Sequence, residues 1–366
     1  YHVMATDNMK DWDLYMSVFS SKGLKDQVKY SDAILYAPDA QFYNGRYYLY
    51  YCLSNDKPVE GVATSDSPVG PFVNGEPLLG PKQIDPTVFV DDDGQAYYYW
   101  GQFAATVAKL KRNMKEIDSA SVTKKLLTAK EHYFHEGSYM FKRKGIYYLV
   151  YTQINNRGLA TSIGYSTSKS PLGPFKYGGV VIDNFGCDPN SWNNHGSIQE
   201  FKGKWYVFYH RSTHGSNSMR KACVEPITFL SDGSIPQVEM TSQGAADPFD
   251  PFQKIDAARA CLLTGKVRVV RSGEHSEELA KIENGNVATY KYFNFTKMPT
   301  KIKFKICSEA GGRVTLFTNS LCPPFNASLE IEPGDGKTYK EYTVNVSGII
   351  LGVQPLFLKF TGEEDK

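Results

Sequence analysis

Residues 44–51 read NGRYYLYY, in which a turn-forming Asn-Gly pair precedes a run of aromatic residues, and this pattern decides the fold. It recurs as DGQAYYYW at residues 93–100, KGIYYLVY at 144–151 and KGKWYVFY at 202–209. Each copy predicts a tight turn followed by a β-strand. The copies lie about 50 residues apart, a spacing typical of propeller blades with four strands each.

A second pattern extends the repeat and reaches the first residues of the sequence. GVATSDSPVGPF at residues 61–72 and IGYSTSKSPLGPF at 163–175 are near copies, and each predicts a strand that ends in a Ser, Pro and Gly turn. A related segment, HVMATDNMKDW, occupies residues 2–12 without a tyrosine strand before it. We therefore predict an all-β protein that begins with a five-bladed β-propeller at residues 1–245, its first blade incomplete. An irregular β-sandwich is the alternative.

The sequence changes character after residue 245. ADPFDPFQ at residues 246–253 is rich in Pro and Asp and is typical of a linker. Alternating segments such as KIKFKI at 301–306 and RVTLFT at 313–318 predict strands, so we expect a β-sandwich at residues 253–366. One short helical turn is expected in SEELAKIENG at residues 276–285.

Composition excludes several classes of protein. The chain has 366 residues, with 41 Lys and Arg against 39 Asp and Glu, and a net charge of +2 does not favour binding to nucleic acid or an anionic membrane. No segment has the roughly 18 to 20 consecutive apolar residues of a membrane span, and the first residues lack the zones of a signal peptide, so we expect a soluble chain. The six cysteines show no paired spacing, which argues against a zinc ribbon or a disulfide scaffold.

Three ionisable residues occupy equivalent positions when the blades are aligned on their turn glycines. Asp85 stands nine residues before Gly94, Glu136 nine before Gly145, and His195 eight before Gly203. Because the innermost strands of a propeller line its central channel, we expect these side chains to converge on one pocket. The alternative is that they are polar groups that cap strand ends.

The corresponding residue of the preceding blade is Tyr36. Asp39 follows three residues later, on the opposite side of a strand, and is interpreted as a structural hydrogen-bonding residue. Paired carboxylates in a pocket rimmed by Tyr and Trp suggest sugar chemistry, because an acid must protonate the glycosidic oxygen while aromatic faces stack on the sugar ring.

Four motifs in the same order resemble those of glycoside hydrolase family 43, the five-bladed propellers that include arabinofuranosidases, xylosidases, arabinanases and galactanases. They are YAPDAQFYNGRYYLYY at residues 36–51, IDPTVFVDDDGQAYYYWG at 84–101, HEGSYMFKRKGIYYLVY at 135–151 and NNHGSIQEFKGKWYVFYH at 193–210. The resemblance covers residues 1 to about 245. The remaining segment is more weakly similar to a family 6 carbohydrate-binding module.

The resemblance implies a role for each candidate residue. Glu136 matches the general acid, and Asp85 matches the acidic residue that tunes the pKa of that acid and orients the substrate. A second carboxylate nearby should raise the pKa of Glu136, because two like charges in one pocket ionise together only at a cost. His195 matches a histidine that often neighbours a bound calcium ion, although a buried histidine that ties loops together is the alternative.

The resemblance also implies residues that bind the sugar. Arg220 matches an arginine that reaches the sugar subsite, and its alternative is a surface or structural arginine. Tyr36, where many members have Trp, and Trp100 complete the predicted substrate-binding residues. The sandwich has no Trp, and Tyr290, Tyr292 and Phe293 are expected in its core more than on a sugar platform.

The family's catalytic base is an aspartate ahead of the tyrosine strand of the first blade. Repeat spacing places it on the order of 20 residues before Tyr1. Asp7 and Asp32 remain candidates within the sequence, whereas the register of Asp39 makes it a poor one.

Two classes of function follow from the sequence. The first is an inverting glycoside hydrolase of the α-L-arabinofuranosidase or β-xylosidase type that acts on plant cell-wall polysaccharide or its oligosaccharides. The alternative is a propeller that binds such polysaccharides without cleaving them, or a galactan-acting member without the usual base. The resemblance to this family also implies a secreted or periplasmic protein.

Overall fold

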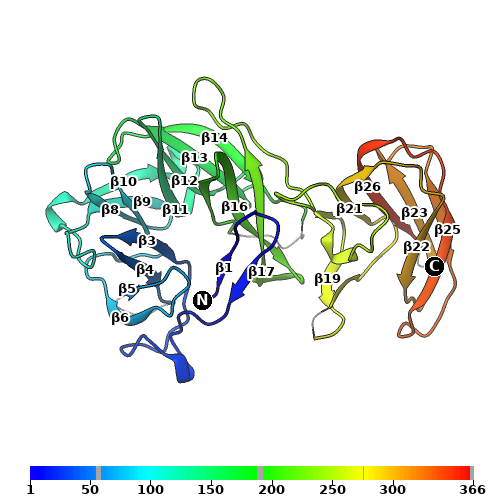
Figure 1. Ribbon diagram of the computed structural model, residues 1–366, viewed down its shortest axis with the longest axis horizontal. Helices are drawn as coiled ribbons and strands as arrows, with labels where there is room; N and C mark the ends of the chain where they lie inside the picture. Colours follow the sequence, from blue (N-terminus) through cyan, green and yellow to red (C-terminus); the bar gives the residue numbers. More distant parts are fainter. Residues whose placement is uncertain (55–58, 188–192, 275, 363–366) are drawn as a thin grey trace. The chain divides into compact units, whose positions relative to one another are not determined.

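The computed structural model describes residues 1–54, 59–187, 193–274 and 276–362 (Figure 1). Nearly all of its regular structure is antiparallel β-sheet, so the predicted all-β class is confirmed. The chain divides into two compact units. The first contains Tyr1–Asp183, Asn193–Tyr209 and Pro226–Val238, and the second contains Asn184–Trp192, His210–Glu225 and Glu239–Lys366.

Successive sheets built mostly from consecutive strands form the propeller. Three of the described sheets have four strands, listed here in spatial order: β3 (Asp39–Tyr43), β4 (Arg46–Cys52), β5 (Glu60–Ser65) and β6 (Val73–Pro77); β7 (Thr87–Val90), β8 (Ala96–Trp100), β9 (Ala104–Lys109) and β10 (Thr123–Thr128); β11 (Phe134–Arg143), β12 (Ile146–Gln153), β13 (Ser162–Ser168) and β14 (Lys176–Asp183). A further sheet has the order β15 (Gly196–Phe201), β16 (Lys204–Thr213) and β17 (Ser216–Ile227), and the boundaries between the units fall within β16 and β17. A short pair joins β1 (Val3–Ala5) to β2 (Asp13–Tyr15). The helical segments of this unit are short: η1 (Gly23–Lys25), η2 (Ser119–Ser121) and α1 (Ala129–His132).

The repeated turns are the hairpins that the sequence predicts. Asn44 and Gly45 both have positive φ, at 47° and 79°, between β3 and β4. The pair at 144–145 joins β11 to β12 and the pair at 202–203 joins β15 to β16 with the same signs. Positive φ at both central residues matches the right-handed twist of the flanking strands. The first strands β3, β11 and β15 therefore end at equivalent turns, whereas a longer turn at residues 91–95 joins β7 to β8. Strand β11 lies beside both β7 and β15.

The tyrosines of the repeat form the core of the first unit. Tyr51, Tyr98 and Tyr148 are completely buried. Buried tyrosine hydroxyls need partners, and the repeat supplies them with main-chain acceptors: the Tyr99 hydroxyl donates to the Pro171 carbonyl at 2.9 Å and the Tyr151 hydroxyl to the His132 carbonyl at 2.7 Å. The repeated tyrosines thus pack between neighbouring sheets.

The second unit is built around an apolar core. Its main sheet has the order β18 (Leu262–Leu263), β21 (Val287–Phe295), β26 (Gly352–Thr361), β23 (Gly312–Thr318) and β24 (Ala327–Ile331). Strand β22 (Lys301–Ile306) pairs with β25 (Lys340–Asn345), and their apolar side chains pack against the same core. The short segment η3 (Ala257–Arg259) precedes β18. Tyr290 and Phe293 are buried in this core, as expected, and the Tyr292 hydroxyl bonds to Glu239.

One expectation for this unit is wrong. The segment predicted as a helical turn forms strand β20 (Glu277–Ala280), which pairs with β19 (Arg268–Arg271). The pairing sets Glu277 opposite Arg271, and opposite charges across a strand pair stabilise the sheet over a short, weakly helical segment. Among the described helices, none is long and apolar enough to cross a membrane.

Candidate active site

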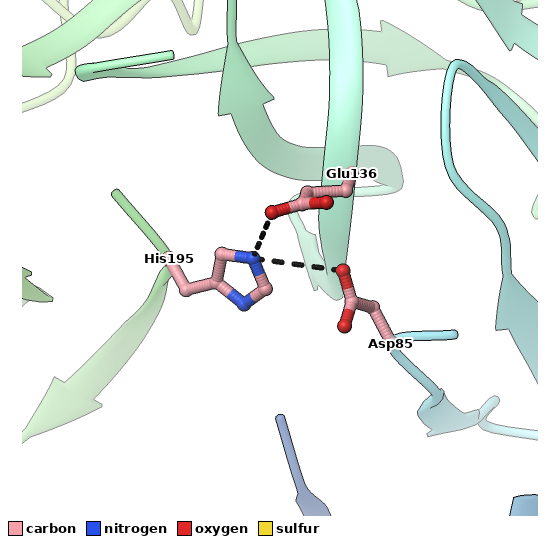
Figure 2. Close-up of side chains that lie close together, drawn as sticks. All are labelled: Asp85, Glu136 and His195. Atoms are coloured by element: carbon pink, nitrogen blue, oxygen red, sulfur yellow. Dashed lines mark hydrogen bonds and ion pairs between the residues drawn. The ribbon is translucent and has the colours of Figure 1, made fainter. Parts of the chain in front are cut away.

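The structure brings Asp85, Glu136 and His195 together in the first unit (Figure 2). Asp85 lies just before β7, Glu136 is the third residue of β11, and His195 lies just before β15. The Nε2 atom of His195 lies 3.1 Å from Oε1 of Glu136 and 3.5 Å from Oδ2 of Asp85. We refer to these residues as the ionisable trio.

A bulge in β11 shapes the wall behind Glu136. The register between β11 and β12 shifts on both sides of Glu136, and the next residue, Gly137, has φ of 65°. A Cβ atom at Gly137 would lie 2.9 Å from both Nε2 of His195 and Oγ1 of Thr152. Only glycine fits this position, because a side chain would collide with the histidine that contacts Glu136.

Glu136 is buried among hydrogen-bond donors. Its Oε2 atom accepts a bond of 2.7 Å from Nε2 of Gln102 and lies 3.7 Å from Nε2 of His135. Burial raises the pKa of Glu136, but the bond to His195, the bond from Gln102 and the attraction of His135 together hold its pKa below the ordinary value. The expected rise in this pKa is therefore wrong for the free site, because the neighbouring donors outweigh the effect of burial.

Sequence reasoning missed two of these neighbours. Gln102 follows the β8 strand and reaches Glu136 across the sheets, while the backbone of Phe103 donates to the His135 carbonyl at 2.6 Å. The proximity of His135 to Glu136 in the sequence was the only signal for its role. Nothing in the repeat indicated Gln102, because it lies in a connection between strands.

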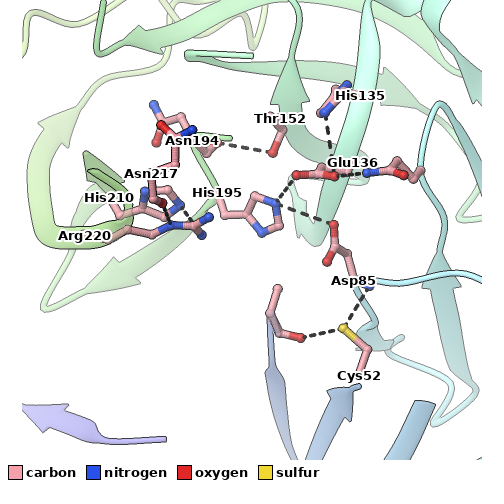
Figure 3. Close-up of polar contacts among 12 residues, drawn as sticks. Cys52, Asp85, His135, Glu136, Thr152, Asn194, His195, His210, Asn217 and Arg220 are labelled. Atoms are coloured by element: carbon pink, nitrogen blue, oxygen red, sulfur yellow. Dashed lines mark hydrogen bonds and ion pairs between the residues drawn. The ribbon is translucent and has the colours of Figure 1, made fainter. Parts of the chain in front are cut away.

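Asp85 is held by its backbone as well as by His195. It has φ of 67° and precedes Pro86, a combination that few residues adopt. Its amide donates to Sγ of Cys52 at 3.4 Å, and the Cys52 thiol donates to the Ala37 carbonyl at 3.5 Å (Figure 3). The Cys52 carbonyl accepts from the amide of Tyr36 at 2.9 Å. Cys52 thus joins the segment that carries Asp85 to the segment that carries Tyr36.

Three other residues near these strands have distinct surroundings. Tyr36 is 44% exposed, so its ring is accessible to a ligand. Trp100 is only 6% exposed and packs against Tyr98 in the core, surroundings that favour a packing role over the predicted sugar contact. Asp39 accepts bonds from the Thr87 hydroxyl at 2.8 Å and the Val88 amide at 2.7 Å, which confirms that it is a structural residue joining β3 to β7.

Arg220 belongs to the second unit, whereas the ionisable trio belongs to the first. It lies on β17, where Nε donates to the Asn217 carbonyl at 3.3 Å and NH1 lies 3.3 Å from Nε2 of His210 (Figure 3). Its predicted contact with sugar stays a prediction.

The ionisable trio is also a candidate metal-binding group. One ligand atom from each residue lies within 4.8 Å of the others. Calcium takes six to eight oxygen ligands, whereas the trio offers carboxylate oxygens and one imidazole nitrogen. These residues fit a divalent cation, and they fit calcium only if water supplies most of its ligands.

Comparisons with known proteins give a consistent result. The family model described as glycosyl hydrolases family 43 matches residues 1–235. The chain is 31% identical to a xylosidase/arabinosidase of Thermoclostridium stercorarium over 84% of this chain and 80% of that protein. It is 29% identical to an arabinoxylan arabinofuranohydrolase of Bacillus subtilis over 87% of this chain and 69% of that protein. The solved α-L-arabinofuranosidase of Clostridium thermocellum matches with a TM-score of 0.52 and 33% identity, over 64% of this chain and 81% of that structure.

Proposed function

Because the chain belongs to glycosyl hydrolase family 43 and is a glycosidase, we propose that it releases arabinofuranose or xylose units from plant cell-wall polysaccharide or its oligosaccharides, with inversion of the anomeric centre. The observation that carries the proposal is the contact of Glu136 with His195 beside Asp85. The relatives are described as xylosidases, arabinosidases and arabinofuranohydrolases, which supports this class of sugar. Family membership favours this glycosidase over a propeller that only binds polysaccharide.

We assign Glu136 as the general acid. In the free site its carboxylate is stabilised by the bond to His195, which keeps its pKa low. A glycosidic oxygen that takes the place of this bond removes that stabilisation, while the sugar also excludes water from the pocket. Both changes favour the protonated carboxyl, so the proton becomes available for transfer to the leaving group where it is needed.

We assign Asp85 as a positioning and electrostatic residue. Its carboxylate shares the imidazole of His195 with Glu136 and favours a proton on Glu136, because like charges in one pocket repel. The buried backbone bond to Cys52 keeps Asp85 in place during binding. For inversion, a second carboxylate must activate water about 6.5 to 9.5 Å from the acid, and we propose an aspartate of the first blade for this role.

Further parts of the proposal concern ions and location. A hydrated calcium ion next to His195 would lower the cost of gathering two carboxylates, and treatment with a chelator should then lower the midpoint of thermal unfolding.

A polymeric substrate outside the cell favours a secreted or periplasmic enzyme. For the second unit we propose a structural role in place of the predicted carbohydrate-binding module, because Tyr290 and Phe293 are buried.

The substitution Glu136→Gln tests the assignment of the acid. Turnover of aryl arabinofuranosides and xylosides should fall by about 10² to 10⁴, because glutamine has no acidic proton to transfer although it matches glutamate in size and shape. Glu131→Gln is the matched control, since Glu131 is exposed on α1 and should leave turnover unchanged. Wild-type turnover in Glu136→Gln would overturn the assignment.

The stereochemical outcome is a separate test. Proton NMR of the first sugar released by the wild-type enzyme should show the anomer opposite to that of the substrate. A product that keeps the anomeric configuration would contradict the inverting mechanism.

A further inference from the structure

A surface pocket of about 560 Å³ lies in the first unit, between the ends of two hairpins. The β11–β12 hairpin contributes Arg143 and Lys144, and the β15–β16 hairpin contributes Gln199, Glu200 and Trp205. Arg143 is the last residue of β11, whereas Glu136 is near the start of that strand. Seven residues of extended strand span about 20 Å, so the pocket is separate from the ionisable trio.

An aromatic wall of fixed orientation forms one side of the pocket. The ring of Trp205 lies 5.3 Å from that of Phe141 and 5.2 Å from that of Phe229, measured between centroids. Trp205 is nevertheless only partly buried, and the guanidinium of Arg143 lies over its ring, 6.0 Å from the centroid. An indole held in place by packing loses little conformational entropy when it binds, and its face suits the C–H groups of a sugar ring.

Hydrogen-bonding groups of three kinds surround this ring. Gln199, Glu200 and Lys144 are exposed and offer an amide, a carboxylate and an ammonium group. The Tyr139 hydroxyl donates to Oε1 of Gln199 at 3.0 Å, which orients that amide. Donors and acceptors at close spacing match the neighbouring hydroxyls of a sugar.

The charges around the pocket favour a neutral ligand. Lys142 is occupied by ion pairs of 2.7 Å to both Asp91 and Asp92. The guanidinium of Arg143 lies over the rings of Phe229 and Trp205, 4.1 Å and 6.0 Å from their centroids. The other two charged residues, Lys144 and Glu200, have opposite charges, so a phosphate or another anion would meet a carboxylate. A polyhydroxylated neutral ligand satisfies both groups.

We propose that this pocket is a second carbohydrate-binding site, which holds a neutral pentose oligosaccharide chain away from the site of cleavage. The class of sugar rests on the proposed function. Binding of the polymer at two places on one enzyme raises the effective concentration of chain at the active site. Loss of the pocket should therefore weaken the binding and turnover of polymeric substrates and leave the turnover of small substrates unchanged.

The experiment uses the full chain with Glu136→Gln, so that the sugar is not consumed, and measures retention on insoluble arabinoxylan. Adding Trp205→Ala should lower retention at least about fivefold, because the aromatic wall is lost. Trp12→Ala is the matched control, since Trp12 is also partly buried and packs on Phe208 outside the pocket. In the active enzyme, Trp205→Ala should leave turnover of an aryl arabinofuranoside within twofold of wild type.

A second variant separates the loss of sugar binding from the loss of packing that Trp205→Ala itself causes. Gln199→Ala with Glu200→Ala removes two exposed groups of the pocket and should also weaken retention. Unchanged retention in this double variant and in Trp205→Ala overturns the proposal, as does wild-type retention that equals that of an unrelated protein. Turnover of aryl glycosides by the wild-type enzyme tests the proposed function separately, because that assay does not use the pocket. Absence of turnover on every aryl glycoside would contradict the proposed function alone.

Discussion

The C-terminal segment 253–362 and the first unit bury different kinds of side chain. The core of this segment is formed by apolar residues such as Val267, Phe295 and Leu316, and its described buried polar residues are uncharged Asn and Thr, whereas the buried Arg211 and Glu225 of the second unit lie outside the segment. The first unit buries carboxylates, among them Glu60 and Glu136. Because a buried charge costs free energy, carboxylates persist in an interior where hydrogen bonding or chemistry uses them. The segment 253–362 is therefore organised for stability, whereas the first unit accepts a free-energy cost to form a site.

The carboxylates inside the first unit are of two kinds. Asp39 accepts bonds from a hydroxyl and an amide, and burial raises its pKa to about 6. Asp85 and Glu136 instead share one imidazole, an arrangement that a bound sugar can rearrange. The comparison separates carboxylates that join strands from carboxylates that act on a ligand.

The largest effect on stability is expected in the second unit. Phe295→Ala removes a ring that is 2% exposed and should lower the free energy of unfolding of this unit by about 3 to 5 kcal/mol. Denaturant unfolding measures the loss. Activity on aryl glycosides, assayed below the unfolding transition, should persist; its disappearance would mean that the site depends on the second unit.

Asp85→Asn and Asp39→Asn test the distinction within the first unit. Asp85→Asn should lower kcat/KM by about 100-fold, or about 2.7 kcal/mol, because a neutral amide no longer favours the proton on Glu136. Asp39→Asn should leave kcat/KM within a few fold but lower stability by about 1 to 3 kcal/mol, since its amide group would face a donor. Equal losses of activity in both variants would remove the distinction.

Glu60 makes stability depend on pH. It is completely buried, its Oε2 accepts from the Tyr98 hydroxyl, and burial followed by repulsion from Asp85 raises its pKa well above the ordinary value. As pH rises above that ordinary value, the unfolded chain ionises at Glu60 while the folded chain keeps the proton. Folding stability is therefore lost toward high pH, by about 1.4 kcal/mol for each pH unit up to the raised pKa.

Glu60→Gln should remove this loss, because glutamine does not ionise and still accepts from Tyr98. Thermal unfolding at pH 5 and pH 8 should show a smaller decrease for the variant than for wild type. Glu131→Gln, at an exposed position, should behave as wild type. If the midpoint of thermal unfolding decreased equally between pH 5 and pH 8 in Glu60→Gln and in wild type, Glu60 would be ionised in the folded chain.

Much of the site was predictable because the first strand of each sheet ends at a turn glycine. Counting back from this glycine placed Asp85 just before β7 and Glu136 near the start of β11, even though the β7–β8 turn is longer and β11 is bulged. The same reasoning separated Asp39 from the trio. It did not predict the bond from Gln102, the packing role of Trp100 or the pocket beside Trp205. These contacts involve residues of different sheets and depend on how the sheets pack.

The sequence by itself determined the strand repeat, the identity of the tyrosine core and the three ionisable residues of the site. These follow from local turn chemistry and from the alternation of side chains along a strand. Only the tertiary structure decided the direction of the pKa shift of Glu136, since that pKa depends on His195 and Gln102 from other segments as well as on the adjacent His135. Local pattern sets where a side chain stands on its strand, whereas electrostatic free energy depends on every charge and dipole brought near it by folding.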